Sequence, residues 1–279
     1  MAGKPKEKTH APATATATAD LVLFRQSDGC AWLTLNRPER ANSLVPELVK
    51  AFRQGLRRAG EKAPRLLVID AAGGAFSSGG DIAGFLAHAG DPAALKAYAS
   101  DLVGALNSAI LDLMAFPAPV VAAVQGPVTG GSLGLLLASD IVVMSEAAFV
   151  QPYYAEVGFA PDGGWTAILP RRIGEARALE IQLLNRRIDA WRAHALGLVS
   201  SVAAPDEFAR TVAKTVETLC RKSAGTLTAT RALIRSAERR EEIARALEAE
   251  RQLFVERIVL PDVLERMRRF NAGAHRVRD

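Results

Sequence analysis

The chain contains few of the residues that mark a disulfide-stabilised, metal-binding or aromatic-rich protein. Cys30 and Cys220 are its only cysteines among 279 residues. This excludes a disulfide framework and a zinc-ligand spacing, and it makes a reducing compartment, the cytoplasm, the expected location. The four histidines are isolated in the sequence and form no pair with metal-ligand spacing, so we expect no metal site. Because aromatic residues make up only 6% of the chain, its core must be built mainly from aliphatic side chains.

The chain also lacks a strong excess of either charge and a continuous membrane segment. Lys and Arg number 35 against 30 Asp and Glu, a net charge of +5. No concentrated basic helix lies beside aromatic residues, so we predict no nucleic-acid partner. Residues 113–139 carry no charge, but Pro117, Pro119 and Pro127 prevent them from forming one continuous helix. We therefore predict no membrane partner either.

The apolar residues that are present follow the pattern of an α/β protein. Short β-branched runs predict strands, and two longer segments, 45–58 and 94–113, carry apolar residues at helical spacing. Strands that alternate with helices indicate crossover units and parallel pairing. The predicted strands are 21–24, 31–35, 66–70, 120–124 and 141–144.

The distribution of these patterns divides the chain into three parts. Residues 1–20 are of low complexity and are interpreted as a flexible tail. Residues 21–204 hold the alternating strands and helices of the core. Residues 205–279 show only helical periodicity, which predicts a helical region that packs on the core or on another subunit.

Two glycine-rich loops are the first candidates for chemistry, because each follows an apolar strand. They occupy residues 73–81 and 126–134, and neither has the spacing of a phosphate-binding or dinucleotide-binding loop. Glycine lets a substrate atom approach the backbone closely. The free N–H groups at the helix start in the second loop suit a developing oxyanion. The alternative interpretation is that both loops are tight turns.

A serine hydrolase is an alternative of a different class. Residues 130–134 match the G-x-S-x-G nucleophile motif around Ser132, and Asp162 with His194 or His275 could complete a triad. However, the motif requires its strand to run straight into the serine, whereas a turn intervenes in this chain.

The two loops occur together with several further motifs, and the set resembles the crotonase superfamily, the enoyl-CoA hydratase/isomerase family. The resemblance covers residues 21–275. It implies a crotonase-like α/β spiral of ββα units and a helical C-terminal trimerisation region, and hence a homotrimer or a dimer of trimers. It also implies an acyl-CoA thioester substrate, as in fatty acid metabolism, and no cofactor beyond the coenzyme A of the substrate. The matching motifs are 35–44, 76–82, 123–131, 138–141, 159–164, 169–174 and 193–199.

The resemblance also implies roles for particular residues. By motif position, the two backbone N–H groups of the family's oxyanion hole fall on Gly80 and Gly131. Such donors stabilise the enolate that forms when a proton leaves the carbon next to a thioester. The positions that hold the nucleotide and pantetheine of the substrate are Arg40, Ala41, Ser78, Gly80, Asp81, Ile82 and Gly131.

The chain departs from the hydratases of this family at both of their catalytic glutamates. The first of those positions is Gly134, and Tyr153-Tyr154 stands where the second usually follows Gln-Pro. Glu156 is close to that second position but not on it. The resemblance therefore puts ordinary hydration in doubt, although a hydratase or another enolate reaction that uses Glu156, Tyr153 or Tyr154 stays an alternative.

Asp162 remains as the candidate acid/base. Several isomerases and a dehalogenase of the superfamily carry a catalytic carboxylate at this point, and one carboxylate suffices to move a double bond. The leading hypothesis is an enoyl-CoA isomerase that uses Asp162. Two alternatives stay open: Asp162 is only a helix N-cap, or the chain is an inactive protein that binds CoA esters.

Overall fold

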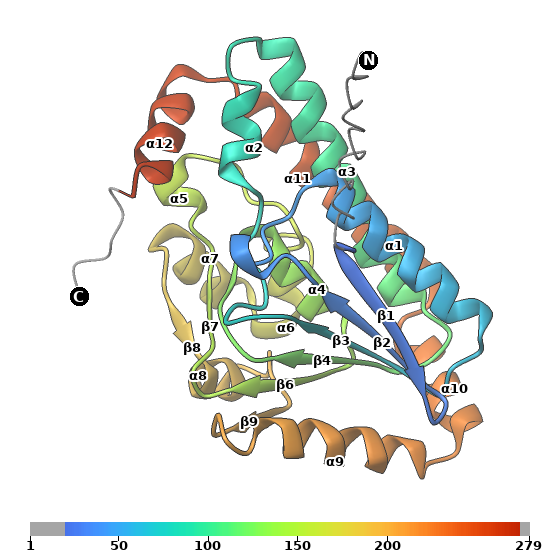
Figure 1. The fold of residues 1–279 in the computed structure, drawn as a ribbon. Coiled ribbons are helices and arrows are strands. Elements are labelled where there is room, and N and C mark those ends of the chain that lie inside the picture. Colours follow the sequence, from blue (N-terminus) through green and yellow to red (C-terminus); the bar gives the residue numbers. More distant parts are fainter. Residues whose placement is uncertain (1–19, 274–279) are drawn as a thin grey trace, which may run out of the picture.

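The structure is a computed structural model that describes residues 20–273, and two sheets run through it. The larger sheet is parallel except for its β1–β2 hairpin. Its strand order is β1-β2-β3-β4-β6-β9, with bounds Val22–Ser27, Cys30–Leu35, Leu66–Ala71, Val120–Val124, Ile141–Ser145 and Ser201–Ala203 (Figure 1). The smaller sheet has the order β5-β7-β8, with bounds Val128–Thr129, Phe149–Gln151 and Ile188–Asp189.

The helices fill the connections between these strands and then form the C-terminal region. Within the core they are α1 Pro46–Glu61, α2 Ile82–Ala87, α3 Pro92–Ala115, α4 Leu133–Ala138, α5 Tyr154–Val157, α6 Leu169–Ile173, α7 Glu175–Leu183 and α8 Ala190–Ala195. Two 3₁₀ turns are η1 Pro38–Arg40 and η2 Gly130–Ser132. The C-terminal helices are α9 Phe208–Cys220, α10 Ala224–Ile234, α11 Ala237–Arg257 and α12 Pro261–Asn271.

These elements confirm the predicted α/β class and its mainly parallel pairing. The five predicted strands correspond to β1, β2, β3, β4 and β6, and the two predicted helices to α1 and α3. The uncharged stretch 113–139 is divided among the end of α3, β4, β5, η2 and α4. No helix within residues 20–273 is long and apolar enough to cross a membrane. The predicted tail, 1–20, lies outside the described residues except for Asp20.

The larger sheet separates two apolar layers because successive side chains of a strand point to opposite faces. Leu33 and Ile69 belong to the main core, against which α1, α3 and α11 pack. Cys30 and Val68 belong to a smaller cluster on the opposite face, which Val212 of α9 covers. Figure 1 shows α9 below the sheet and α1 and α3 above it.

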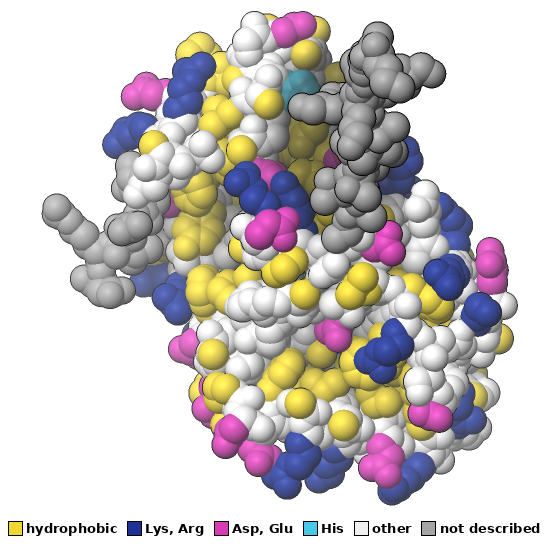
Figure 2. All heavy atoms as spheres, in the orientation of Figure 1, with side chains coloured by type: hydrophobic (Ala, Val, Ile, Leu, Met, Phe, Trp, Pro, Cys, Tyr) yellow, Lys and Arg dark blue, Asp and Glu magenta, His cyan; other side chains and the backbone are white. Residues whose placement is uncertain are grey.

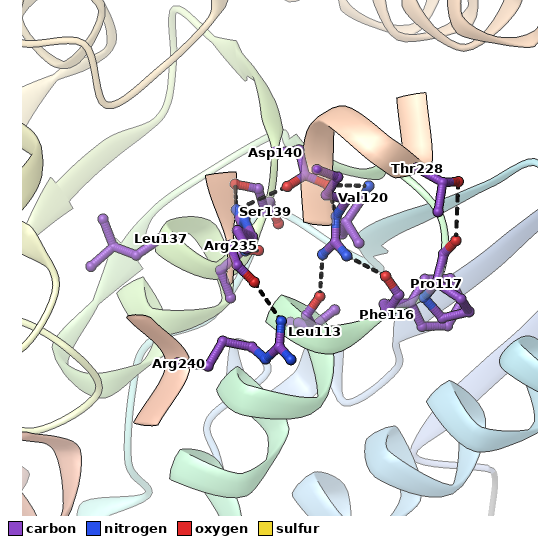
Figure 3. A network of polar contacts seen from close by, with 12 residues as sticks. Leu113, Phe116, Pro117, Val120, Leu137, Ser139, Asp140, Thr228, Arg235 and Arg240 are labelled. Atoms are coloured by element: carbon purple, nitrogen blue, oxygen red, sulfur yellow. Dashed lines mark hydrogen bonds and ion pairs between the residues drawn. The ribbon is translucent and has the colours of Figure 1, made fainter. Parts of the chain in front are cut away.

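A buried ion-pair network attaches the C-terminal helices to the core. Arg231 of α10 and Arg235, the residue that follows this helix, both pair with Asp140, at 2.6 and 3.0 Å (Figure 3). Arg231 also donates to the Leu113 carbonyl at the end of α3, and Arg235 to the Ser139 carbonyl at the end of α4. The last carbonyls of a helix lack the regular intrahelical bonds, and Arg231 and Arg235 each supply donors to one such helix end. The predicted helical region is thus present, while its role in trimerisation stays a prediction.

Candidate active site

One cavity of about 600 Å³ is lined by all of the residues in the oxyanion, acid/base and substrate-binding positions that the crotonase resemblance implies. It opens between the two glycine-rich loops, α5 and the C-terminal helices. Its lining includes Arg40, Ala41, Ser78, Gly80, Asp81, Ile82, Gly131 and Asp162. Residues far apart in the sequence therefore meet at one place, as the crotonase resemblance implies.

A buried amide holds the first loop, and backbone groups join the second loop to it. Asn42 is fully buried, and its side-chain amide donates to the carbonyls of Ala72 and Ala75 at 2.8 and 2.9 Å. The second loop joins the first through the backbone, where Thr129 donates to Ser77 at 3.0 Å. Gly126 permits this approach, because a Cβ atom there would lie 2.0 Å from the carbonyl oxygen of Gly74.

The backbone N–H groups of Gly80 and Gly131 are left available by this arrangement. Around Gly80, the hydrogen bonds to Leu44 come from its two neighbours: Leu44 donates to Gly79, and Asp81 donates to Leu44. Gly131 lies within η2, whose first N–H groups precede the first intrahelical bond. Both glycines line the cavity, and their role as oxyanion donors, which the resemblance implies, stays a prediction.

Asp162 lies directly against Gly131. A Cβ atom on Gly131 would be 2.8 and 2.9 Å from the two carboxylate oxygens of Asp162. The backbone of the next residue is equally close, since a Cβ atom on Gly163 would lie 2.2 Å from the Gly131 carbonyl oxygen. Glycine at positions 131 and 163 is thus what allows a carboxylate to sit beside a proposed oxyanion donor.

The environment of Asp162 favours a group that can both accept and return a proton. Burial raises the pKa of Asp162 to about 7, the hydrogen bond from the Tyr154 hydroxyl opposes the rise, and the charge of Glu250 adds to it. The Tyr154 hydroxyl donates to Oδ1 of Asp162 and lies 3.1 Å from its backbone carbonyl. A base with a pKa near neutral pH transfers protons efficiently in both directions.

The interpretation of Asp162 as a helix N-cap is wrong. The Asp162 carboxylate accepts the Tyr154 hydroxyl, and α6 begins only at Leu169. A different carboxylate caps this segment: Glu250 of α11 accepts the backbone N–H groups of Gly164, Thr166 and Ala167 at 2.7 to 2.8 Å.

Glu250 is a site residue that sequence reasoning missed. It is 5% exposed and comes from a helix more than 80 residues beyond the segment that it holds. Its sequence surroundings resemble any charged helix face, so no local pattern distinguishes it. The C-terminal region therefore lines the cavity through Phe254. Through Glu250 it holds the segment that follows Asp162.

A charged group stands at the side of the cavity where the resemblance places coenzyme A. Asp81 caps α2 and pairs with Arg37 at 2.8 Å and Arg40 at 3.3 Å. Burial acts to raise the pKa of Asp81, but the two guanidinium groups outweigh it and hold the pKa below its usual value. Figure 2 shows basic and acidic side chains together beneath the position of α2, with apolar side chains gathered next to them.

The inner part of the cavity is apolar and largely aromatic. Phe159 packs against Phe254 with ring centroids 4.9 Å apart and against Phe85 at 5.8 Å. Leu102 and Leu106 of α3 complete this wall. Such a surface suits a hydrocarbon or aromatic acyl group rather than a charged one.

The two positions where the family's hydratases carry glutamate are occupied differently in this structure. A Cβ atom on Gly134 would lie 2.3 Å from the Ile110 side chain and 2.6 Å from the Gly163 carbonyl oxygen, so no side chain fits there. Glu156 is not among the residues that line the cavity, whereas Tyr153 and Tyr154 are. Of the alternatives left open by the sequence, the geometry thus favours a tyrosine over Glu156.

The structure gives no support to the serine hydrolase hypothesis. Ser132 is fully buried, and its hydroxyl donates to the carbonyls of Thr129 and Ser77 at 2.7 and 3.1 Å. It does not line the cavity, and the His194 ring is engaged with the Val199 carbonyl. His275 lies outside the described residues.

The mainly parallel sheet, the paired glycine loops and the helical C-terminal region define a crotonase-fold protein. Within that class, the model of the enoyl-CoA hydratase/isomerase family matches residues 25–272. The chain belongs to this family.

Known relatives agree with the assignment. A Mycobacterium bovis protein named as a probable enoyl-CoA hydratase is 39% identical over 196 residues, which are 68% of each chain. The crystal structure of an enoyl-CoA hydratase from Mycobacterium avium subsp. paratuberculosis is similar with a TM-score of 0.80 and 30% identity, over 91% of this chain and 100% of the other. The structure of Pseudomonas aeruginosa OdaA is similar with a TM-score of 0.79 and 27% identity, over 92% and 100% of the two chains.

Proposed function

We propose that this protein is an enoyl-CoA isomerase that moves a carbon–carbon double bond through a thioester enolate. The observation that carries the proposal is the buried carboxylate of Asp162, which lies against the Gly131 backbone and whose pKa is raised to about 7. A double-bond shift needs one group that removes a proton and returns it elsewhere, and one carboxylate can do both.

The proposed reaction uses backbone donors and one side chain. The N–H groups of Gly80 and Gly131 bind the thioester oxygen of a 3-enoyl-CoA. The ionised Asp162 takes a proton from C2, and the electron pair delocalises over the thioester to give a dienolate whose oxygen the two donors stabilise. Asp162 then returns the proton to C4, which leaves a 2-enoyl-CoA and restores the carboxylate. No cofactor other than the coenzyme A of the substrate is needed in this scheme.

The substrate class follows from the two ends of the cavity. We place the acyl chain against the Phe85, Phe159 and Phe254 wall, and the pantetheine and nucleotide beside Ser78, Ile82 and Arg40. An apolar acyl chain fits this wall, because a charged acyl end would lose its hydration there without a partner.

Hydration of a 2-enoyl-CoA is the second candidate function. It is favoured by relatives that are named as enoyl-CoA hydratases. In that case Asp162 would activate water, and the Tyr154 hydroxyl is the nearest further proton carrier. Against it stands Gly134, whose surroundings leave no room for a second carboxylate.

The test is to supply a 3-enoyl-CoA and a 2-enoyl-CoA in separate reactions and to quantify double-bond shift and hydration by chromatography. We expect isomerisation to dominate. Hydration of the 2-enoyl-CoA as fast as isomerisation of the 3-enoyl-CoA would establish the second candidate. If neither occurs, calorimetry with acetoacetyl-CoA and free acetoacetate distinguishes an inactive CoA-ester binder, which takes up only the thioester, from a protein with another ligand.

A further inference from the structure

The only two cysteines of the chain lie in contact on the side of the sheet opposite the proposed active site. Cys30 is the first residue of β2, Cys220 is the last residue of α9, and their sulfur atoms are 3.2 Å apart. Both are free thiols in the structure. A disulfide has a sulfur–sulfur length of about 2.05 Å. The two atoms therefore need to approach by only about 1 Å to be bonded.

Neighbouring contacts hold the two thiols in this arrangement. The Arg65 guanidinium donates to the carbonyls of Cys220 and Lys222 at 2.6 and 3.0 Å, which fixes the C-terminal end of α9 beside the sheet. Cys30 is buried in the small apolar cluster that Val212 of α9 covers. The backbones on both sides are thus positioned before any bond forms.

A small oxidant has a route to the pair. A cavity of about 580 Å³ between the outer face of the sheet and α9 is lined by both cysteines, together with Arg25 and Trp32 of the hairpin. Figure 2 shows a hollowed apolar area in the region where Figure 1 places the sheet above α9. Cys30 itself is buried, whereas Cys220 is partly exposed.

We propose that Cys30 and Cys220 form a reversible intramolecular disulfide that ties α9 to β2 when the protein meets a low-molecular-weight disulfide such as glutathione disulfide. The proposal does not depend on the acyl-CoA reaction. The bond joins two elements 190 positions apart in the sequence.

The disulfide forms in two steps, and the environment of each thiol sets their order. The Cys220 thiolate attacks one sulfur of glutathione disulfide and expels a glutathione thiolate. Cys30 then loses its proton to solvent, attacks the Cys220 sulfur of the mixed disulfide and expels the second glutathione. Two cysteine thiols are oxidised, and one glutathione disulfide is reduced to two glutathiones.

The pKa of Cys30 supports Cys220 as the first nucleophile. Burial raises the pKa of Cys30 to about 12, and the hydrogen bond to Cys220 and the charge of Cys220 add to the rise. Cys30 therefore stays protonated during the first step. Once Cys220 is part of a mixed disulfide it carries no charge, so one of these causes disappears and Cys30 is easier to ionise.

The test treats the native full-length protein with glutathione disulfide and follows free thiols and intact mass. We expect both thiols to be lost together, the mass to fall by two hydrogen atoms, and peptide mapping to link the peptides of Cys30 and Cys220. Two variants serve as controls. Cys30→Ser should accumulate one glutathione on Cys220, and Cys220→Ser should keep its buried thiol.

Three outcomes overturn the proposal. The first is a wild-type protein that retains glutathione on Cys220, and the second is a wild-type protein that forms disulfides between chains. The third is a wild-type protein that keeps both thiols under conditions in which Cys30→Ser takes up glutathione. The last comparison matters because it shows that the oxidant reaches Cys220.

A second measurement tests whether the bond ties α9 to the sheet. Cross-linking elements distant in the sequence restricts the unfolded chain, so the urea midpoint of the oxidised protein should rise and return on reduction with dithiothreitol. The midpoint of Cys30→Ser should not respond to either treatment. Equal midpoints of the oxidised and reduced wild-type protein would show that the bond does not hold α9 in this way.

Discussion

At the scale of single residues, the environment of Asp162 decides what the cavity can do. The residue is 7% exposed, and its carboxylate accepts one phenol hydroxyl and lies beside the Gly131 backbone. A carboxylate in such a place is expensive to ionise, which is the condition under which it both accepts and donates a proton near neutral pH.

The first prediction is that Asp162→Asn abolishes most of the isomerase activity. Asparagine keeps the size of the side chain but does not accept a proton, so the rate should fall by about two to four orders of magnitude. Turnover of a 3-enoyl-CoA measures the rate. Calorimetry with acetoacetyl-CoA measures binding, which should persist in the variant. A variant that isomerises at the wild-type rate would exclude Asp162 as the base.

The second prediction concerns the pH dependence of the rate and rests on two neighbours with opposite effects. The Tyr154 hydroxyl stabilises the ionised Asp162, whereas the charge of Glu250 disfavours it. Tyr154→Phe should therefore raise the pKa of Asp162 and move the acid limb of kcat/KM to higher pH. Glu250→Gln should lower that pKa and move the limb to lower pH. Tyr154 and Glu250 are positioning residues in this scheme.

Profiles of kcat/KM against pH test this pair of shifts. Glu242→Gln is the matched control, because Glu242 lies on the same helix but pairs on the surface with Arg171. Its profile should coincide with that of the wild-type protein. If the acid limb moved in the same direction in Tyr154→Phe and Glu250→Gln, the electrostatic account would be contradicted. Such a result would indicate a general loosening of the loop that carries Asp162.

At the scale of elements, the close packing of α4 against the Asp162 loop depends on glycine. Gly134 of α4 faces the Gly163 carbonyl on one side and Ile110 of α3 on the other. The same contact that excludes a hydratase glutamate thus brings the loop to the start of η2. The close approach of the Asp162 loop to α4 and the absence of a second carboxylate thus have the same cause at position 134.

The third prediction is that Gly134→Ala destabilises the protein, although alanine normally favours a helix. The added methyl group overlaps Ile110 and a backbone oxygen, so we expect a loss of about 1–3 kcal/mol in the free energy of unfolding. Gly225→Ala is the control, because a Cβ atom there meets nothing within 4 Å. It should be neutral or stabilising by up to about 1 kcal/mol in urea unfolding.

At the scale of the whole molecule, the buried Asp162 makes stability depend on pH. Its pKa is about 7 in the folded chain, and a carboxyl group titrates near about 3.9 when unfolded. Between these values the folded chain holds a proton that the unfolded chain has released. Stability therefore decreases as pH rises through this window, and the full cost of the buried charge is present above about pH 7.

The fourth prediction follows from this decrease of stability with rising pH. Asp162→Asn removes the ionisable group, so its stability relative to the wild-type protein should increase from pH 5 to pH 8. Urea unfolding at both values measures the difference. If the free energies of unfolding of the two proteins differed by the same amount at both pH values, the pKa of Asp162 in the folded chain would be close to its unfolded value.

Local patterns in the sequence were enough to predict most of the fold. The five β-branched runs became strands and the two periodic segments became α1 and α3, because each buries one apolar face that repeats at a fixed spacing. The strands β5, β7, β8 and β9 were not predicted. They have only two or three residues each, too few for a repeat to be visible.

The glycine loops and Asp162 could likewise be recognised before the fold was known, because a motif is a local property of the chain. What the motifs could not predict is which groups surround Asp162. Only the packing of distant elements brings the Tyr154 hydroxyl and the Glu250 carboxylate to the Asp162 loop, and Cys30 to Cys220. Burial, dielectric environment and sulfur–sulfur distance are properties of that packing. They decide the pKa values and the reactivity that a linear pattern leaves open.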